Sequence, residues 1–198
     1  MGTQRLEAFS DGVLAIIITI MVLEMKIPHG DDVEALKTVW PVLLSYILSF
    51  VNVGIYWNNH HHLFHVSKKI NASVMWANIH LLFWLSLMPF ATGWMGENHF
   101  TNLPVALFGG VLLMSGMAYY ILSQTIIHLH GRKSQIAQAI GKDVKGIISV
   151  VIYASAIPLA FVNTSISLAL YVLVAAMWLV PDRRIEKKII NEEEKKDA

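Results

Sequence analysis

The sequence predicts an all-α, polytopic membrane protein with six transmembrane helices and both termini in the cytoplasm. Two observations lead to this fold class. Of the 198 residues, 55% are hydrophobic and only 15% are charged, whereas a soluble domain carries about 25% charged residues. The charges are also unevenly placed, because four long stretches contain no Asp, Glu, Lys or Arg: residues 38–67, 70–96, 98–131 and 146–181.

The same composition excludes several classes of protein. Charge-free stretches of this length exclude a soluble enzyme and a disordered chain. A net charge of +1 provides no basic surface for a nucleic acid. The chain contains no cysteine, which excludes a disulfide framework, a thiolate metal site and a cysteine nucleophile. We therefore expect a protein whose surroundings are the lipid bilayer, with no nucleic-acid partner.

Breaks in the apolar sequence define the six spans. A helix needs about 20 apolar residues to cross roughly 30 Å of hydrocarbon. The first span ends before Pro28, the third before Glu97, and the fourth opens near Pro104, a residue suited to a first helical turn. The last apolar block, 146–180, is too long for one span, and we divide it at the cluster that begins at Asn163. The predicted spans are 5–26, 37–65, 70–95, 103–129, 145–162 and 164–181, which form a transmembrane domain of residues 1–184 before a charged cytoplasmic tail, 185–198.

Basic residues predict the orientation of these spans. Only Lys26 and Lys37 fall on one side of the membrane. The other thirteen Lys and Arg residues fall on the opposite side: Arg5, Lys68, Lys69, Arg132, Lys133, Lys142, Lys145, Arg183, Arg184, Lys187, Lys188, Lys195 and Lys196. By the positive-inside rule this second side is cytoplasmic, with both termini there. A five-span arrangement would move the last six basic residues across the membrane and weaken this asymmetry.

The first span is unusually short. Its uninterrupted apolar run, residues 12–23, covers 12 residues, or about 18 Å at 1.5 Å per residue. Asp11 and Glu24 flank this run and are drawn toward the hydrocarbon, where a lipid-facing carboxylate costs at least about 2.5 kcal/mol. They therefore face the interior of the bundle or a water-filled path, or else reach the headgroups while the bilayer thins locally. Arg5 and Asp11 are six residues apart and cannot pair on one helix face, so each needs a partner elsewhere. We expect these partners at the end of the second span, residues 56–62, which begins Tyr-Trp-Asn-Asn and ends in three histidines.

Four histidines near the end of the second span could supply such partners or bind a metal. His60, His61, His62 and His65 lie within one and a half turns, and three consecutive residues cannot converge on one ion because each points about 100° from the last. Two imidazoles without cysteine or a suitably spaced carboxylate make a weak zinc site. We expect these histidines to make hydrogen bonds, with Asp11 or Arg5 as possible partners, and we predict no metal site.

Two motifs resemble those of a known family. The segment from Arg5 to Gly12, Arg-Leu-Glu-Ala-Phe-Ser-Asp-Gly, resembles the R-x-x-x-F-S-D-G signature of the transmembrane protein 175 family, which comprises lysosomal potassium channels and prokaryotic relatives. The segment from Trp57 to Phe64, Trp-Asn-Asn-His-His-His-Leu-Phe, resembles the end of helix 2 in that family. Six spans and about 200 residues match the single-repeat prokaryotic form. The resemblance implies a potassium-permeable homotetramer whose central pore is lined by helix 1 and narrowed by apolar side chains.

Matching positions imply roles for particular residues. The pore-facing position seven residues after the motif phenylalanine is Ile16, followed by Ile20 and Leu23, with Thr19 as the polar residue near the constriction. Packed core remains the alternative for this stripe, because the first span is apolar all round and residues spaced i, i+4, i+7 share one face in either case. The resemblance also implies a brace between helices 1 and 2, formed by Arg5, Phe9, Ser10, Asp11, Gly12, Trp57 and His60.

These inferences predict a potassium-selective leak channel in the plasma membrane. It would conduct potassium passively, without a cofactor and without enzymatic activity, and its partners would be copies of itself, potassium ions and the bilayer. An apolar neck would favour weakly hydrated potassium over sodium, with modest selectivity. Two alternatives stay open: a secondary transporter that uses Asp11, Glu24 and the histidines as relays, and a membrane enzyme with a histidine-bound metal.

Overall fold

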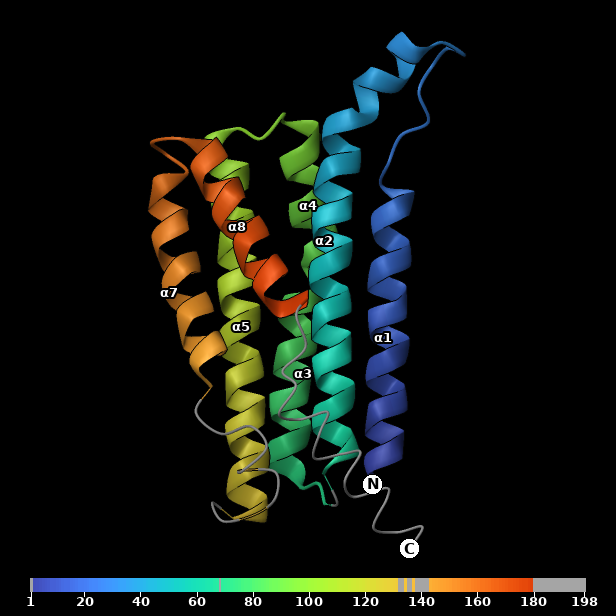
Figure 1. Cartoon of the computed structure of the whole chain (residues 1–198). Coiled ribbons are helices and arrows are strands. Elements are labelled where there is room, and N and C mark those ends of the chain that lie inside the picture. The colour runs from blue at the N-terminus through green and yellow to red at the C-terminus, as the bar shows by residue number, and fades with distance from the viewer. Residues whose placement is uncertain (1, 68, 132–133, 135–136, 138–142, 180–198) are drawn as a thin grey trace, which may run out of the picture.

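The computed structural model of the chain is a bundle of antiparallel helices (Figure 1). It describes residues 2–67, 69–131, 134, 137 and 143–179, and within these ranges all regular structure is helical. The helices are α1 (Thr3–Leu23), α2 (Val33–His65), α3 (Ala72–Ser86), α4 (Met88–Glu97), α5 (Asn102–His130), α7 (Val144–Leu159) and α8 (Thr164–Leu179). The prediction of an all-α fold is confirmed.

The first two helices match the predicted spans closely at the end of the bundle that holds the N-terminus. α1 ends at Leu23, three residues earlier than predicted, and Gly30 in the following loop adopts a positive φ of 127°. α2 begins earlier than predicted because the side chain of Asp32 caps it, accepting a hydrogen bond from the Ala35 amide at 2.8 Å. The first turns of α2 extend past the other helices (Figure 1). Pro41 lies inside α2, next to these turns.

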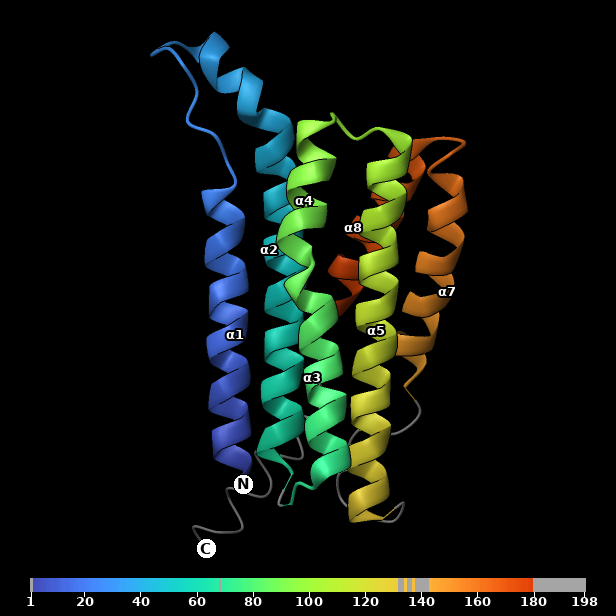
Figure 2. The same cartoon turned by 180° about the vertical axis from the view of Figure 1, so that it is seen from behind.

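The third predicted span consists of two helices rather than one. α3 and α4 follow each other along the bundle and are separated at Leu87 (Figure 2). Pro89 explains the break, because its nitrogen carries no hydrogen and cannot bond the carbonyl four residues earlier. Asn71 caps α3 through a hydrogen bond from the Val74 amide at 3.0 Å. Together, residues 72–97 are long and apolar enough to cross a membrane.

The last apolar block divides close to the predicted position. α7 ends at Leu159 and α8 begins at Thr164, where Asn163 accepts a hydrogen bond from the Ser165 amide at 2.9 Å. Each helix has 16 residues, which corresponds to about 24 Å and is shorter than the hydrocarbon thickness. Among the described residues, four segments are long and apolar enough to span a membrane, and α7 and α8 are the shorter apolar helices. The predicted end of the sixth span and the tail 185–198 lie outside the described residues.

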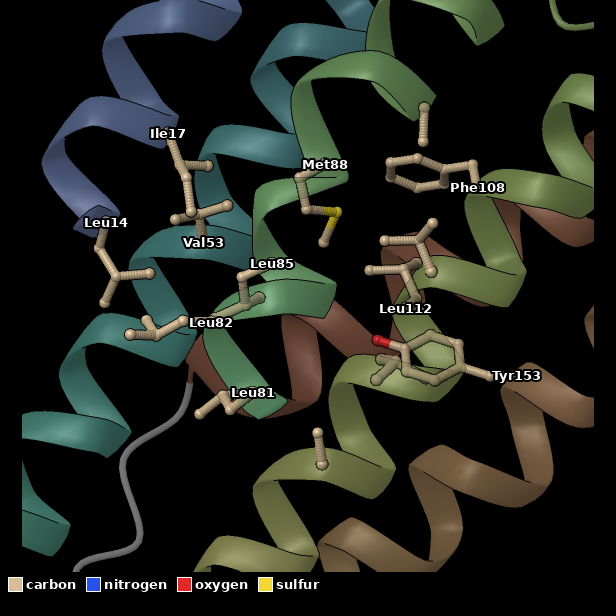
Figure 3. Packing of buried hydrophobic residues seen from close by; sticks show 14 of the residues in the cluster. Leu14, Ile17, Val53, Leu81, Leu82, Leu85, Met88, Phe108, Leu112 and Tyr153 are labelled. Carbon is tan, nitrogen blue, oxygen red and sulfur yellow. The ribbon is translucent and has the colours of Figure 1, made fainter. Parts of the chain in front are cut away.

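The core of the bundle is formed mainly by α1 to α5. Leu14 and Ile17 of α1 pack toward α2 and α3. Leu81, Leu82 and Leu85 of α3 belong to the same buried cluster (Figure 3). Both views place α1 at one edge of the bundle, beside α2 and the α3–α4 pair (Figures 1 and 2). α1 therefore has one side packed against the other helices and another side that no described helix covers.

Two glycines allow close helix approaches. A Cβ atom at Gly96 of α4 would lie 2.7 Å from the Cα of Val42 in α2. A Cβ at Gly109 of α5 would lie 2.7 Å from Cζ of Tyr171 in α8. Tyr171 is fully buried, and its hydroxyl donates a hydrogen bond to the Val105 carbonyl at 3.2 Å. Small residues at these positions let helices pack closely, which is a common basis of association inside membranes.

We expect Gly109→Ala to destabilise the protein because the added methyl group would collide with the buried Tyr171 ring. Overpacking of this kind costs about 1–3 kcal/mol. The neighbouring Gly110 provides a matched control, since a Cβ there meets nothing within 4 Å. Thermal unfolding of the purified protein in detergent should show a lower midpoint for Gly109→Ala and an unchanged or raised midpoint for Gly110→Ala. Equal midpoints for the two variants would contradict the assigned contact.

Candidate ion pathway

α1 presents two different sides. Its buried side consists of Leu6, Ser10, Leu14, Ile17 and Met21. The predicted pore residues lie on the uncovered side, where Ile16 is 59% exposed, Ile20 is 40% exposed and Leu23 is 79% exposed. The alternative that this stripe forms part of the core of a single chain is therefore wrong.

The uncovered stripe continues through the motif at the start of α1. Phe9 is 53% exposed, and Arg5, Gly12 and Thr19 are also exposed. The Thr19 hydroxyl bonds the carbonyls of Ala15 and Ile16, both at 3.0 Å. These contacts hold the hydroxyl against its own helix, next to the isoleucines. The stripe is thus apolar from Ile16 to Leu23, and the Thr19 hydroxyl lies beside it.

Two carboxylates of α1 contact α2 near the N-terminal end of the bundle. The indole Nε1 of Trp57 donates a hydrogen bond to Oδ1 of Asp11 at 3.1 Å. Nδ1 of His61 lies 2.8 Å from Oε1 of Glu7. The prediction that Asp11 finds its partner among residues 56–62 of α2 is confirmed, and the partner is Trp57. Within the described part of the chain, Arg5 makes no ion pair.

A second, buried set of hydrogen bonds connects α1, α2 and α3. Nε2 of His60 lies 2.7 Å from Oδ1 of Asn78, Nδ2 of Asn78 donates to Oγ of Ser10 at 2.8 Å, and Ser10 donates to the Leu6 carbonyl at 2.9 Å. Because Asn78 Oδ1 can only accept, His60 carries its proton on Nε2. All three side chains are at least 97% buried. Ser10 and His60 were both predicted for a brace between the first two helices, and here Asn78 of α3 joins them.

Sequence reasoning missed Asn78, which joins the two predicted residues. The sequence feature that could have identified Asn78 is its amide inside the charge-free apolar stretch 70–96, because a buried polar side chain there needs a partner. His80 lies in the same span, and we would expect it to bond across helices. It instead accepts a hydrogen bond from Nε1 of Trp84, one turn along α3, at 3.0 Å.

The histidines of α2 take separate roles. His60 is buried, whereas the side chain of His61 is exposed and contacts Glu7. The ring centroids of His61 and His65 are 6.0 Å apart. In the ranges that the structure describes, no group of three or more His, Asp or Glu side chains is arranged to hold a metal ion. Glu24, the other carboxylate that flanks the apolar run, is exposed beyond the end of α1.

An ion pair lies at the opposite end of the bundle. Nζ of Lys26, in the loop after α1, lies 2.7 Å from Oε1 of Glu97 at the end of α4. The hydrogen bond and charge of Glu97 raise the pKa of Lys26. Both side chains are well exposed, so we expect this pair to add little stability. The pair places the α1–α2 loop beside the end of α4.

Comparisons with known proteins point to one family. The family model described as "Endosomal/lysosomal potassium channel TMEM175" matches residues 5–89. A potassium channel of Chryseobacterium sp. (strain P1-3) is 55% identical over 189 residues, covering 96% of this chain and 98% of the relative. The human endosomal/lysosomal proton channel TMEM175 is 40% identical over 81 residues, which is 34% of this chain and 16% of the human protein.

A solved structure resembles the whole bundle. The crystal structure of a lysosomal potassium-selective channel TMEM175 homolog from Chamaesiphon minutus superposes with a TM-score of 0.78. It is 27% identical and the match covers 90% of this chain and 96% of that one. The likeness therefore extends well beyond residues 5–89, the region that the family model matches.

We expect Asn78→Leu to destabilise the bundle because it leaves the buried His60 and Ser10 without their shared partner. Hydrogen bonds of this type contribute about 1–2 kcal/mol. Asn58→Leu, at an exposed amide of α2, is the matched control and should leave the thermal midpoint in detergent close to that of the parent.

A double-mutant cycle with Ser10→Ala tests the connection directly. The two changes should be less than additive, since either one already breaks the Asn78–Ser10 bond. Full additivity would show that the two residues do not act together.

Proposed function

This chain belongs to the endosomal/lysosomal potassium channel TMEM175 family, and on this premise we propose that it is a potassium channel that conducts ions passively through a pore lined by α1. Its relatives in Chryseobacterium and Streptomyces collinus are named potassium channels and match it over most of their length. The solved homolog is a potassium-selective channel. These relatives are channels rather than enzymes, which supports a transport function for this chain.

The observation that carries the pore assignment is the uncovered apolar stripe of α1. A single α1 cannot enclose a path for ions, so several copies must contribute one helix each. Closed cyclic symmetry is the usual arrangement of identical subunits, and we propose a homotetramer with Ile16, Ile20 and Leu23 facing its axis. This arrangement would cover side chains that are between 40% and 79% exposed in the single chain.

An apolar neck determines how ions pass. An ion that enters it loses part of its hydration shell, and the isoleucine and leucine side chains offer no replacement ligands. Potassium loses its water more readily than sodium, so the neck favours potassium by hydration cost. The same neck can close by dewetting when it narrows. Thr19, next to Ile16 and Ile20, supplies a hydroxyl oxygen at this level.

The hydrogen-bonded contacts of α1 would position this stripe. Asp11 bonds Trp57, Glu7 contacts His61, and Ser10 bonds Asn78. All three contacts lie on the sides of α1 that face the protomer, and together they would fix the rotation of α1 about its own axis. We propose that they act as positioning residues, with Phe9, Gly12 and Arg5 on the side turned toward the neighbouring subunits.

The orientation in the membrane follows from the basic residues. Arg5 and Lys69 lie at the end of the bundle that holds the N-terminus, while Lys26 and Lys37 lie at the other end. We propose that the first of these ends is cytoplasmic and that the channel resides in the plasma membrane.

We expect Ile16→Asn to raise single-channel conductance and to lower the preference for potassium over sodium. The amide would replace lost hydration and reduce the barrier in the neck. Ile16→Val, which keeps the position apolar, is the matched control and should retain the preference. Current recordings of the reconstituted protein in potassium and sodium gradients measure both quantities. Substrate-dependent turnover in place of ohmic currents would instead support a secondary transporter.

The absence of cysteine from the chain allows a direct test of which side of α1 faces the ions. Ile16→Cys and Ile20→Cys should make the currents sensitive to Cd²⁺ or Ag⁺, because four thiols around a narrow axis bind a soft metal ion. Ile17→Cys, on the buried side, should remain insensitive. Inhibition at Ile17 without inhibition at Ile16 would contradict the pore assignment.

A further inference from the structure

A cavity of about 310 Å³ lies between α2, α5 and α7, away from the stripe and the hydrogen bonds of α1. Its walls are largely apolar, with Ile55 from α2, Met117 from α5, and Ile147 and Val151 from α7. Trp178, near the end of α8, also lines it. The described part of α8, up to Leu179, runs at a tilt across α5 and α2 (Figure 1).

Three tyrosines bring hydroxyl groups to this apolar space. Tyr119 of α5 donates a hydrogen bond to the Asn59 carbonyl at 3.2 Å. Tyr56 of α2 and Tyr153 of α7 also line the cavity, and neither hydroxyl has a hydrogen-bond partner among the residues that the structure describes. Tyr153 is only 4% exposed. Figure 3 shows its ring reaching from α7 into the bundle with the hydroxyl at the inner end.

Unpartnered hydroxyls in an apolar cavity restrict what can fill it. Neither hydroxyl is among the fully buried unpartnered atoms of the described residues, so both open onto the cavity. An O–H that meets only apolar groups there is unfavourable, so the occupant should carry an acceptor oxygen. Water would satisfy the hydroxyls, but the cavity has the volume of about ten water molecules at roughly 30 Å³ each. The apolar walls offer too few partners for so many waters. Among the described residues, Asp143, whose Oδ1 accepts a hydrogen bond from the Gly146 amide, is the one charged residue that lines the cavity, and it would repel an anion. A cation would have to give up its hydration between otherwise apolar walls.

We propose that this cavity binds a neutral amphipathic molecule taken up from the bilayer, with an alkyl chain against the apolar walls and one oxygen that accepts hydrogen bonds from Tyr56 and Tyr153. The shared chemistry is an alkyl chain that ends in a hydroxyl, ether or ester oxygen. Either a free long-chain alcohol or the acyl ester of a phospholipid provides it. The site is independent of the ion pathway proposed above.

Photolabelling of the full-length protein in detergent tests the site. A long-chain alcohol that carries an alkyl diazirine should label peptides containing Tyr56, Tyr119 or Tyr153, as located by mass spectrometry. Excess decanol should prevent this labelling, whereas excess decane should not, because decane lacks the acceptor oxygen. Equal competition by decane, or no labelling of these peptides, would overturn the proposal.

Conservative variants test the two hydroxyls. Tyr56→Phe combined with Tyr153→Phe keeps both rings and should weaken competition by decanol about tenfold or more, since each variant removes one hydrogen bond. Tyr46→Phe changes a tyrosine of α2 that does not line the cavity and should behave like the parent. Unchanged competition in the double variant would overturn recognition through the hydroxyls. Should the double variant not assemble in size-exclusion chromatography, the decanol and decane comparison on the parent protein still decides the proposal.

Added phospholipid distinguishes the two sources of the ligand. Displacement of the label by phospholipid at concentrations that saturate the detergent micelles would identify an acyl ester as the occupant. Displacement by decanol alone would identify a free single-chain molecule. Both results support the shared chemistry and differ only in the origin of the oxygen.

Discussion

The rotation of α1 about its own axis is the constraint on which the rest of the proposed mechanism depends. α1 is apolar all round, and lipid is as apolar as leucine, so burial alone does not decide which side of this helix faces the protomer. Polar contacts decide it. Ser10 reaches Asn78 in a fully buried position, and Asp11 and Glu7 reach Trp57 and His61 on α2. With these bonds made, Ile16, Ile20 and Leu23 are turned away from the core.

The helices that receive α1 are themselves held by small and polar residues. Gly96 lets α4 approach α2 closely, and at the same interface the hydroxyls of Ser49 and Thr92 lie 2.6 Å apart in a buried hydrogen bond. The break at Leu87 offsets α4 from α3, and α1 packs against both. α7 and α8 pack against α5 and α2, farther from α1. The part of the bundle proposed to carry ions is thus separate from the part that contains the tyrosine-lined cavity.

Several features of this structure could be predicted from the sequence because their causes are local. The spans follow from charge-free stretches, and the turn between α7 and α8 follows from the polar cluster at Asn163. The partner of Asp11 could be placed at the end of α2, since Arg5 is out of reach on the same helix. Other features could not be predicted this way. The break in the third span depends on Pro89 inside an apolar run, and the link through Asn78 depends on which side of α3 meets α1.

The sequence by itself determined that this chain is helical, that its helices belong in a membrane, and which motifs place it near a family of channels. The charge-free stretches and the two motifs are sufficient for these conclusions, because each is a property of a single segment of the chain. Only the tertiary structure decided that the isoleucine stripe lies outside the core of the single chain and that Ser10, His60 and Asn78 meet. When a helix is apolar on every side, its sequence pattern does not indicate which side faces the core. Its orientation is set instead by polar partners on helices distant in the sequence.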